Sequence, residues 1–451
     1  MNFMMAFGWS SIMLCLGMFL RAKIRFFQNM LVPASVIAGI LGFAFINICQ
    51  STKINLGTNT EMFTSIVNNL FTVSFISISL TDTAGKDSNE FKKIVKGATA
   101  LGLIWCLLYA LTPIIATFII MVLGKSFHMN AIYGMLIQFA FCQGPGQAAA
   151  YGQIFEQYGW TDAGMTAITF AAIGFIVAFL LGIPVAKAGI KKGLAKHCGQ
   201  IDIRIQKGYY KKDEQTEYMI KDTTCNSNIE TIAFHFALIG GCYILATGIS
   251  KILGMIPGFL GSSMENMMFM NGMYAAYIVK AIMKRLKIDF LKENVLQSKI
   301  TGLVSDYLVV CAFMAISVTV IRRWIVPILI VSFVITIITF ILCFYFGCRI
   351  GGSNDFERTL GLYGTCTGTV PSGISLLRII DPNFETATSV ELGACNIVML
   401  CSTPVYILIL ALASGSLSIL NTMIGLSICV VIYLIILKLT KSWGKKTYSW
   451  K

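Results

Sequence analysis

Long apolar runs alternate with short polar connections along almost the whole chain. Apolar runs of about 18 to 25 residues can cross a bilayer as helices. We therefore expect eleven spans, at 4–22, 31–49, 62–80, 94–123, 164–186, 231–253, 265–283, 299–321, 325–347, 387–413 and 417–438. This pattern predicts an all-α polytopic membrane protein.

Two further apolar stretches, 131–156 and 357–381, are interrupted by helix-breaking and polar residues. The first contains Gly144-Pro145-Gly146 flanked by Gln143 and Gln147, and the second contains the sequence GTCTGTVPSG. Broken backbone at membrane depth is tolerated only where it is buried in protein or lines a watery cavity. We expect both stretches to be re-entrant hairpins that dip into the membrane rather than cross it.

The two interrupted stretches occupy matching places in two halves of the chain. Cys142-Gln143-Gly144 aligns with Cys366-Thr367-Gly368. Each half holds five spans, and an odd number makes the second copy enter from the opposite face, which predicts inverted repeats. The expected division is a first repeat at 1–188, a cytoplasmic linker at 189–228, a second repeat at 229–413, and an extra span with a basic tail at 414–451.

Composition and charge agree with a membrane protein. Hydrophobic residues make up 56% of the 451 residues, charged residues 12%, and the mean hydropathy is +0.75. A net charge of +14 could indicate nucleic acid or anionic lipid as a partner. However, Lys and Arg gather in alternate connections, above all in 187–221, which fits the positive-inside rule. We expect the N-terminus outside, the C-terminus in the cytoplasm, the lipid bilayer as surroundings and no nucleic acid.

The sequence offers little for a catalytic or metal-dependent function. The cysteines are scattered without a C-x-x-C pair, and His128, His197 and His235 lie far apart, so we expect no metal site and no cofactor. A membrane-embedded enzyme would need acidic clusters or a His/Asp pair, and no D-D-x-x-D, Walker A or G-x-S-x-G motif occurs. A channel stays open as an alternative, although paired inverted hairpins favour alternating access. A secondary transporter without catalytic residues is the preferred interpretation.

Several motifs in order resemble the bacterial sodium:glutamate symporter family, whose fold is related to the 2-hydroxycarboxylate transporters. They are LVPASVIAGILG (31–42), FISISLTD (75–82), the dense stretch 144–187, GTCTGTVPSGIS (364–375) and LGACNIVMLCSTP (392–404). The resemblance implies ten core helices with two re-entrant hairpins, a homodimer in the bacterial inner membrane and an elevator-type movement. It also implies sodium-coupled uptake of glutamate or a similar anionic amino acid. Pro145, Gln147 and the alanines at 148–150 depart from the family's hairpins, which leaves another small carboxylate as an alternative substrate.

The candidate site follows from the interrupted stretches. Glycines let the backbone approach a ligand closely, and amides and hydroxyls can donate to a carboxylate. The candidate substrate-binding residues are Gln143, Gly144, Gly146, Gln147, Thr365, Thr367, Gly368, Ser372, Gly373 and Arg378. Small residues are also common where membrane helices pack, so packing is the competing interpretation.

Three polar residues inside predicted spans are candidates for binding sodium, which takes hard oxygen ligands: Thr169, Asn396 and Asp306. Arg378 could equally pair with Asp381 or reach towards water. Asp162 and Glu385 each precede a predicted span, and we expect them to cap the helices that follow.

Overall fold

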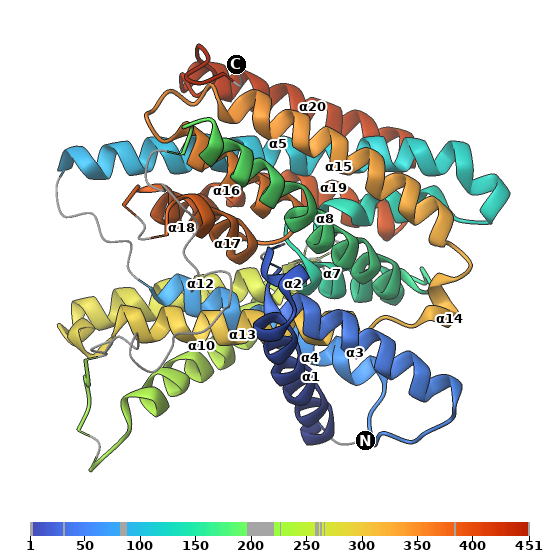
Figure 1. The fold of residues 1–451 in the computed structure, drawn as a ribbon, viewed down its shortest axis with the longest axis horizontal. Coiled ribbons are helices and arrows are strands. Elements are labelled where there is room, and N and C mark those ends of the chain that lie inside the picture. The colour runs from blue at the N-terminus through green and yellow to red at the C-terminus, as the bar shows by residue number, and fades with distance from the viewer. Residues whose placement is uncertain are drawn as a thin grey trace. The chain divides into compact units, whose positions relative to one another are not determined.

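The computed structural model describes residues 3–29, 32–81, 88–195, 221–225, 227–257, 261, 264–265, 267–382 and 385–449, and its regular elements there are helices (Figure 1). The first half holds α1 (Phe3–Lys23), α2 (Arg25–Asn29), α3 (Ala34–Ser51), α4 (Thr60–Leu80), α5 (Ser88–Phe127), η1 (Ala131–Leu136), α6 (Ile137–Phe141), α7 (Pro145–Gln157) and α8 (Ala163–Lys191). The second half holds α10 (Thr231–Gly254), α12 (Met268–Arg285), η3 (Asp289–Leu291), α13 (Asn294–Met314), α14 (Val318–Ile321), α15 (Ile325–Gly347), α16 (Asp355–Thr367), α17 (Val370–Ile380), α18 (Thr388–Val398), η4 (Met399–Ser402), α19 (Thr403–Ala413) and α20 (Ile419–Leu439).

Among the described residues, ten helical segments are long and apolar enough to cross a membrane, and they coincide with ten of the eleven predicted spans. The described part of the chain is therefore all-helical, consistent with a polytopic membrane protein. The eleventh prediction, at 265–283, falls on α12, which forms a helix but is not among the ten. Its 18 residues include Lys280, Lys284 and Arg285, so it is more polar than the other spans.

The predicted span at 299–321 is wrong at its C-terminal end. α13 stops at Met314, and α14 begins only at Val318. The side chain of Asn47 on α3 stabilises this interruption, because its Nδ2 donates to the Ile316 carbonyl at 2.9 Å and its Oδ1 accepts from the Val318 N–H at 2.8 Å. An amide on a neighbouring helix thus replaces the helical hydrogen bonds that the chain gives up.

The predicted span at 387–413 is a helical segment in three parts, α18, η4 and α19. Pro404 lies in the first turn of α19, where its missing N–H costs no helical hydrogen bond. The corresponding Pro184 instead lies inside α8, which runs unbroken for 29 residues. The two halves therefore differ at this position.

The chain forms two compact units, each built from segments of both halves. Unit 1 takes in Met1–Thr64, Ala84–Tyr209 and Val310–Lys451, and unit 2 takes in Ser65–Thr83 and Tyr210–Val309. In unit 2, α10 and α12 pack side by side (Figure 1), and Ser77 forms hydrogen bonds with Gln297 and Thr301 on α13. Both interrupted stretches belong to unit 1.

Candidate functional site

The first interruption, residues Cys142–Gly144, separates α6 from α7 and is called the first break. Gly144 adopts a φ of +79°, which a residue with a side chain rarely tolerates. Pro145 then occupies the first position of α7, where its fixed φ suits a helix start. Gly-Pro therefore ends one helix and begins another within three residues, as the sequence predicted.

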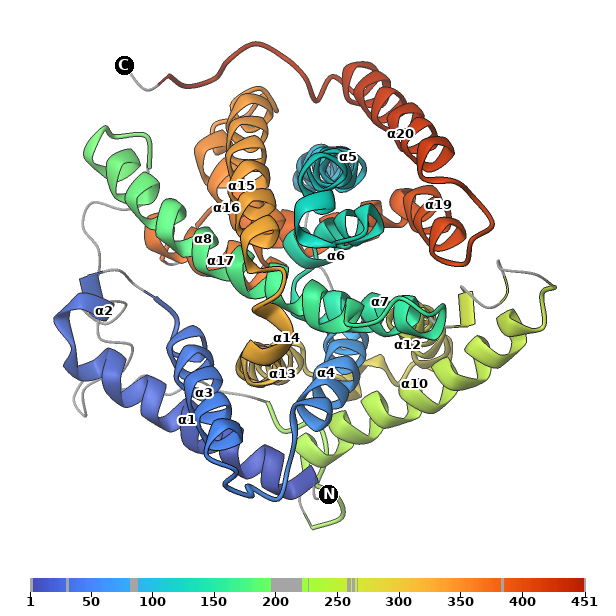
Figure 2. The same ribbon diagram turned by 90° about the vertical axis from the view of Figure 1, so that its right-hand side faces the viewer.

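A tryptophan on α5 holds the first break in place. The indole Nε1 of Trp105 donates to the Cys142 carbonyl at 2.8 Å, and this side chain is 1% exposed. In Figure 2, α5 is viewed almost along its own axis and lies beside α6. The bond satisfies a carbonyl that the helix leaves unpaired.

The two glutamines at the first break are buried and bonded to tyrosines. Gln147 accepts from the Tyr109 hydroxyl at 2.8 Å and donates to the Tyr406 hydroxyl at 3.0 Å, and Gln143 donates to Tyr406 at 3.4 Å. Tyr151 stacks on Phe139 with ring centroids 3.9 Å apart. The amides of the candidate site thus form a neutral polar network inside an aromatic frame.

The second interruption, Gly368–Thr369, separates α16 from α17 and is called the second break. Thr369 is the N-cap of α17 and forms a capping box with Ser372, whose Oγ accepts from the Thr369 N–H at 2.8 Å. The hydroxyl of Thr365 donates to the Gly361 carbonyl at 2.9 Å, and that of Thr367 to the Tyr363 carbonyl at 2.7 Å. The second break is therefore stabilised mainly by its own helices.

The two breaks touch each other. A Cβ atom added to Gly144 would lie 2.3 Å from the Thr369 Cγ2 and 3.0 Å from the Gly368 carbonyl oxygen. On α8, a Cβ at Gly174 would lie 2.6 Å from the Thr367 carbonyl oxygen. Segments more than 200 residues apart in the sequence thus bring their broken backbone together inside unit 1.

Not every candidate glycine faces a site. A Cβ at Gly373 would lie 2.3 Å from the Thr365 Oγ1 and 2.4 Å from the Gly361 carbonyl oxygen, so this glycine lets α16 and α17 pack closely. Close packing of the two helices therefore explains why a glycine is needed at position 373. Gly146 is buried in the first turn of α7.

The remaining candidates lie away from the breaks or bond within their own helices. Arg378 is exposed in the last turn of α17, at the opposite end from the second break. Thr169 donates to the Met165 carbonyl at 2.7 Å on α8, and Asn396 to the Gly393 carbonyl at 2.9 Å on α18. Asp306 is exposed on the part of α13 that belongs to unit 2.

Neither α8 nor α18 has a side-chain hydrogen bond from its N-cap residue. Asp162 is the N-cap of α8 but makes no capping bond, and Glu156 accepts from the Gly164 N–H at 2.9 Å instead. Ala387, not Glu385, is the N-cap of α18. Asp381, which is fully buried, accepts from the N–H groups of Glu385 and Thr386 at 2.8 and 2.9 Å.

A buried ion cluster lies where α16 begins. The Arg358 guanidinium donates to both carboxylate oxygens of Glu391 on α18, at 2.7 and 2.5 Å, and to Asp355 at 3.1 Å. The side chain of Arg358 is 11% exposed, and those of Glu391 and Asp355 are each 1% exposed. We call these three residues the charged triad.

The tail after α20 reaches the same place. Thr447 donates its hydroxyl to Asp355 at 2.7 Å, and its N–H to the Cys348 carbonyl at 2.9 Å. The Tyr448 hydroxyl donates to Thr359 on α16 at 2.9 Å. The C-terminal tail therefore contributes to the hydrogen bonding of the charged triad.

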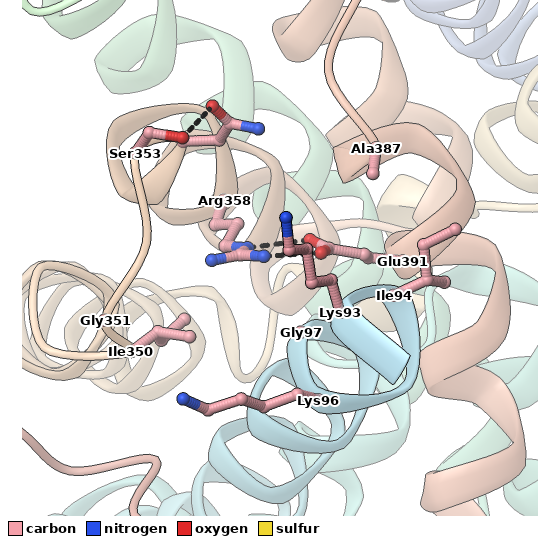
Figure 3. A pocket seen from close by; sticks show the side chains of 11 residues that line it. Lys93, Ile94, Lys96, Gly97, Ile350, Gly351, Ser353, Arg358, Ala387 and Glu391 are labelled. Carbon is pink, nitrogen blue, oxygen red and sulfur yellow. Dashed lines mark hydrogen bonds and ion pairs between the residues drawn. The ribbon is translucent and has the colours of Figure 1, made fainter. Parts of the chain in front are cut away.

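A pocket of about 750 Å³ opens beside the triad (Figure 3). Lys93 and Lys96 from α5 line one wall, and the 350–354 loop lines another. Figure 3 shows both lysine side chains extending from α5, with Lys93 beside the Arg358–Glu391 pair. The other lining residues are Ile94, Gly97 and Ala387, together with Arg358 and Glu391 of the triad.

Within unit 1, two interrupted helices bring their broken backbone into contact, an arrangement typical of ion-coupled transporters. The family described as sodium/glutamate symporter matches residues 1–386, which include both breaks. The chain belongs to the sodium/glutamate symporter family. No curated protein matches it. The assignment makes the chain a membrane protein of a transporter family and confirms the resemblance seen in the motifs.

Sequence reasoning missed Trp105, Tyr109, Tyr406, Arg358 and Glu391. Two of them carried a usable signal: Arg358 lies inside an interrupted apolar stretch and Glu391 inside the predicted span at 387–413, where an ionisable residue is a functional candidate by default. The aromatic residues carried none, because aromatic side chains are frequent throughout the predicted spans. Their roles follow only from tertiary contacts.

Proposed function

We propose that the chain couples inward sodium movement to the uptake of glutamate or a similar anionic amino acid. The contact between the two breaks, with Gly144 against Thr369, is the observation that carries the proposal. Broken helices offer a positive dipole end to an anion and unwound carbonyls to a cation at one place. The match to the sodium/glutamate symporter family supports this substrate pair.

The residues around the breaks divide into two chemical roles. In this proposal the substrate carboxylate binds at the N-terminus of α7 and to the side-chain amides of Gln143 and Gln147. When the substrate binds, these amides would give up their hydrogen bonds to the tyrosine hydroxyls. The hydroxyls of Thr365 and Thr367 already donate to helix carbonyls, so their oxygens are left to accept or to ligate. This favours them as sodium ligands rather than as donors to a carboxylate.

The other sodium candidates remain part of the proposal. Thr169 and Asn396 each commit a donor to their own helix, which leaves oxygen lone pairs for a cation. Within unit 2, Asp306 would offer its carboxylate to a sodium ion. Replacing any one of these three residues by a residue without a side-chain oxygen should weaken the dependence of uptake on sodium.

The transport cycle we propose is of the elevator type. Each break with its two short helices would form a re-entrant hairpin, the two entering from opposite faces as parts of inverted repeats at 1–188 and 229–413. The 189–228 linker would join them, α20 would be an extra span, and two chains would form a homodimer. The N-terminus would lie outside and the C-terminus in the cytoplasm of a bacterial inner membrane, consistent with the basic tail.

The energetics favour more than one sodium ion per substrate. A monoanionic amino acid moving with one sodium ion is electroneutral and gains nothing from the membrane potential. Each additional positive charge contributes about 2.3 kcal/mol per 100 mV. We therefore expect uptake to carry net positive charge inward.

The test is uptake of radiolabelled L-glutamate into proteoliposomes with an inward sodium gradient, compared with a matched potassium gradient. Accumulation only with sodium, increased by an inside-negative potential, is the expected result. Equal uptake under both gradients, or none from folded protein, would contradict the proposal for glutamate. Repeating the assay with small dicarboxylates would then test the alternative substrate class.

A further inference from the structure

The pocket beside the charged triad is lined by three cations, Lys93, Lys96 and Arg358, and by one carboxylate, Glu391. Glu357, a further buried carboxylate in the first turn of α16, does not line the pocket. Arg358 lies between two carboxylates, so the triad carries a net charge of −1. Asp355 and Glu391 lie in the first turns of α16 and α18, where the helix dipoles offset about that amount of negative charge. The ammonium groups of Lys93 and Lys96 are then left as the excess charge of the pocket.

The two lysines lie on one face of α5. Residues three apart on a helix have Cβ atoms about 5–6 Å from each other, so Lys93 and Lys96 can reach into the same space. Figure 3 shows them on the pocket side of α5, below and beside the triad. Two separate cations on flexible stems suit a ligand with two separate negative groups.

The facing loop adds a neutral donor. The Asn354 side chain accepts from the Ser353 hydroxyl through its Oδ1 at 3.0 Å, which leaves its amide nitrogen to donate. Of the residues that the structure describes along this pocket, Glu391 is the one carboxylate, and both of its oxygens accept from Arg358. The pocket thus has donors on two walls and a carboxylate whose oxygens are already bonded.

The size of the pocket fits a small organic ligand. Its volume of about 750 Å³ lies within the range of about 300–1,000 Å³ that ligand sites occupy. It lies at the start of α16, at the other end of that helix from the second break. A ligand here would join α5 to the loop that leads into α16.

We propose that this pocket binds a small dicarboxylate independently of sodium, with Lys93 and Lys96 each holding one carboxylate. The choice of ligand class rests on the proposed function, because the transported anion carries two carboxylates. Under the topology proposed above, the pocket opens to the cytoplasm, so the ligand would be the transported anion after its release from the breaks. The pocket would then be a second binding site that substrate occupies on the inner face.

The experiment is a calorimetric titration of the purified full-length protein with glutarate in sodium-free potassium buffer. Glutarate carries two carboxylates and no ammonium group, so it probes the two lysines directly. We expect saturable binding by the wild type and at least a tenfold loss of affinity in K93Q/K96Q. The charge-retaining K93R/K96R should keep most of the affinity and separate loss of charge from loss of folding.

Lys92 supplies the matched control, because it is a neighbouring exposed lysine on α5 that does not line the pocket. K92Q should bind glutarate as the wild type does. Equal affinity in K92Q and K93Q/K96Q, or no sodium-free binding by the wild type, would overturn the proposal. Binding that is lost in nanodiscs with anionic lipid but kept in zwitterionic lipid would also overturn it, in favour of a lipid headgroup as the occupant.

Sodium-driven glutamate uptake measured on the same preparations separates this proposal from the transport proposal. Intact uptake together with no sodium-free glutarate binding contradicts the pocket alone. Glutarate binding that depends on Lys93 and Lys96, together with no sodium-driven uptake, supports the pocket as a dicarboxylate site and contradicts the transport proposal.

Discussion

The two breaks occupy matching positions in the chain and are stabilised in different ways. At the first, the neutral amides of Gln143 and Gln147 bond to tyrosines from α5 and α19. At the second, Thr369 and Ser372 cap their own helix, and the charged triad lies at the far end of α16. The first break therefore depends on its neighbours, whereas the second has most of its support within itself.

The largest effect should come from removing the cation of the triad. Arg358→Gln leaves two buried carboxylates without their partner, which costs about 3–5 kcal/mol when a buried pair is broken. Thermal unfolding in detergent should show a strongly lowered midpoint. Arg322→Gln makes the same change at an exposed position and should have little effect. Similar midpoints in the two variants would show that the triad does not stabilise the second half.

The first break should respond to loss of a single amide. Gln147→Leu leaves the buried hydroxyls of Tyr109 and Tyr406 without this partner, and we expect a loss of about 1–3 kcal/mol. Gln157→Leu, at an exposed position on the same helix, is the control. Tyr109→Phe combined with Gln147→Leu should cost less than the sum of the single changes. Strict additivity would argue against a shared network.

Close packing around the triad gives the next test. A Cβ at Gly97 would lie 2.1 Å from the Glu391 Oε1, so Gly97→Ala should push α5 and α18 apart and cost about 1–3 kcal/mol. Gly393→Ala on α18 has open space around it and should be neutral or slightly stabilising. Unfolding midpoints of the two variants give the comparison, and a neutral Gly97→Ala would contradict the packing described here.

The smallest effect should come from the tail. Thr447→Val removes the hydroxyl that donates to Asp355 at 2.7 Å, for an expected loss of about 1 kcal/mol. Thr440→Val is a useful comparison, because that exposed hydroxyl bonds within its own turn. A larger loss for Thr440→Val would mean that the tail contact contributes nothing to the triad.

Much of the fold could be predicted from apolar length alone, because a bilayer sets the length of the helices that cross it. The exceptions have identifiable causes. α12 is not apolar enough to be counted as a membrane-crossing helix because of its three basic residues. The helix predicted at 299–321 ends early because the Asn47 side chain bonds to its backbone groups. A side chain that is distant in the sequence leaves no mark on the local pattern of apolar residues.

The position of the candidate site was predictable, but its chemistry was only partly so. Gly144-Pro145 identified the first break, and the interrupting residues of GTCTGTVPSG identified the second. The sequence could not indicate that Gln147 is bonded to Tyr109 and Tyr406, or that Ser372 serves as a cap. Such roles depend on which side chains the fold brings into contact.

We propose that contact between the two breaks forms the transport site, and Gly144→Ala is the variant that disturbs this contact. Its control is Gly159→Ala, because Gly159 also has a positive φ, of +91°, but open space where a Cβ would be added. The measurement is sodium-driven L-glutamate uptake into proteoliposomes. We expect Gly159→Ala to keep uptake and Gly144→Ala to lose it, with partial recovery in Gly144→Ala/Thr369→Ser, which removes the opposing methyl group. Equal uptake by Gly144→Ala and Gly159→Ala would contradict the account.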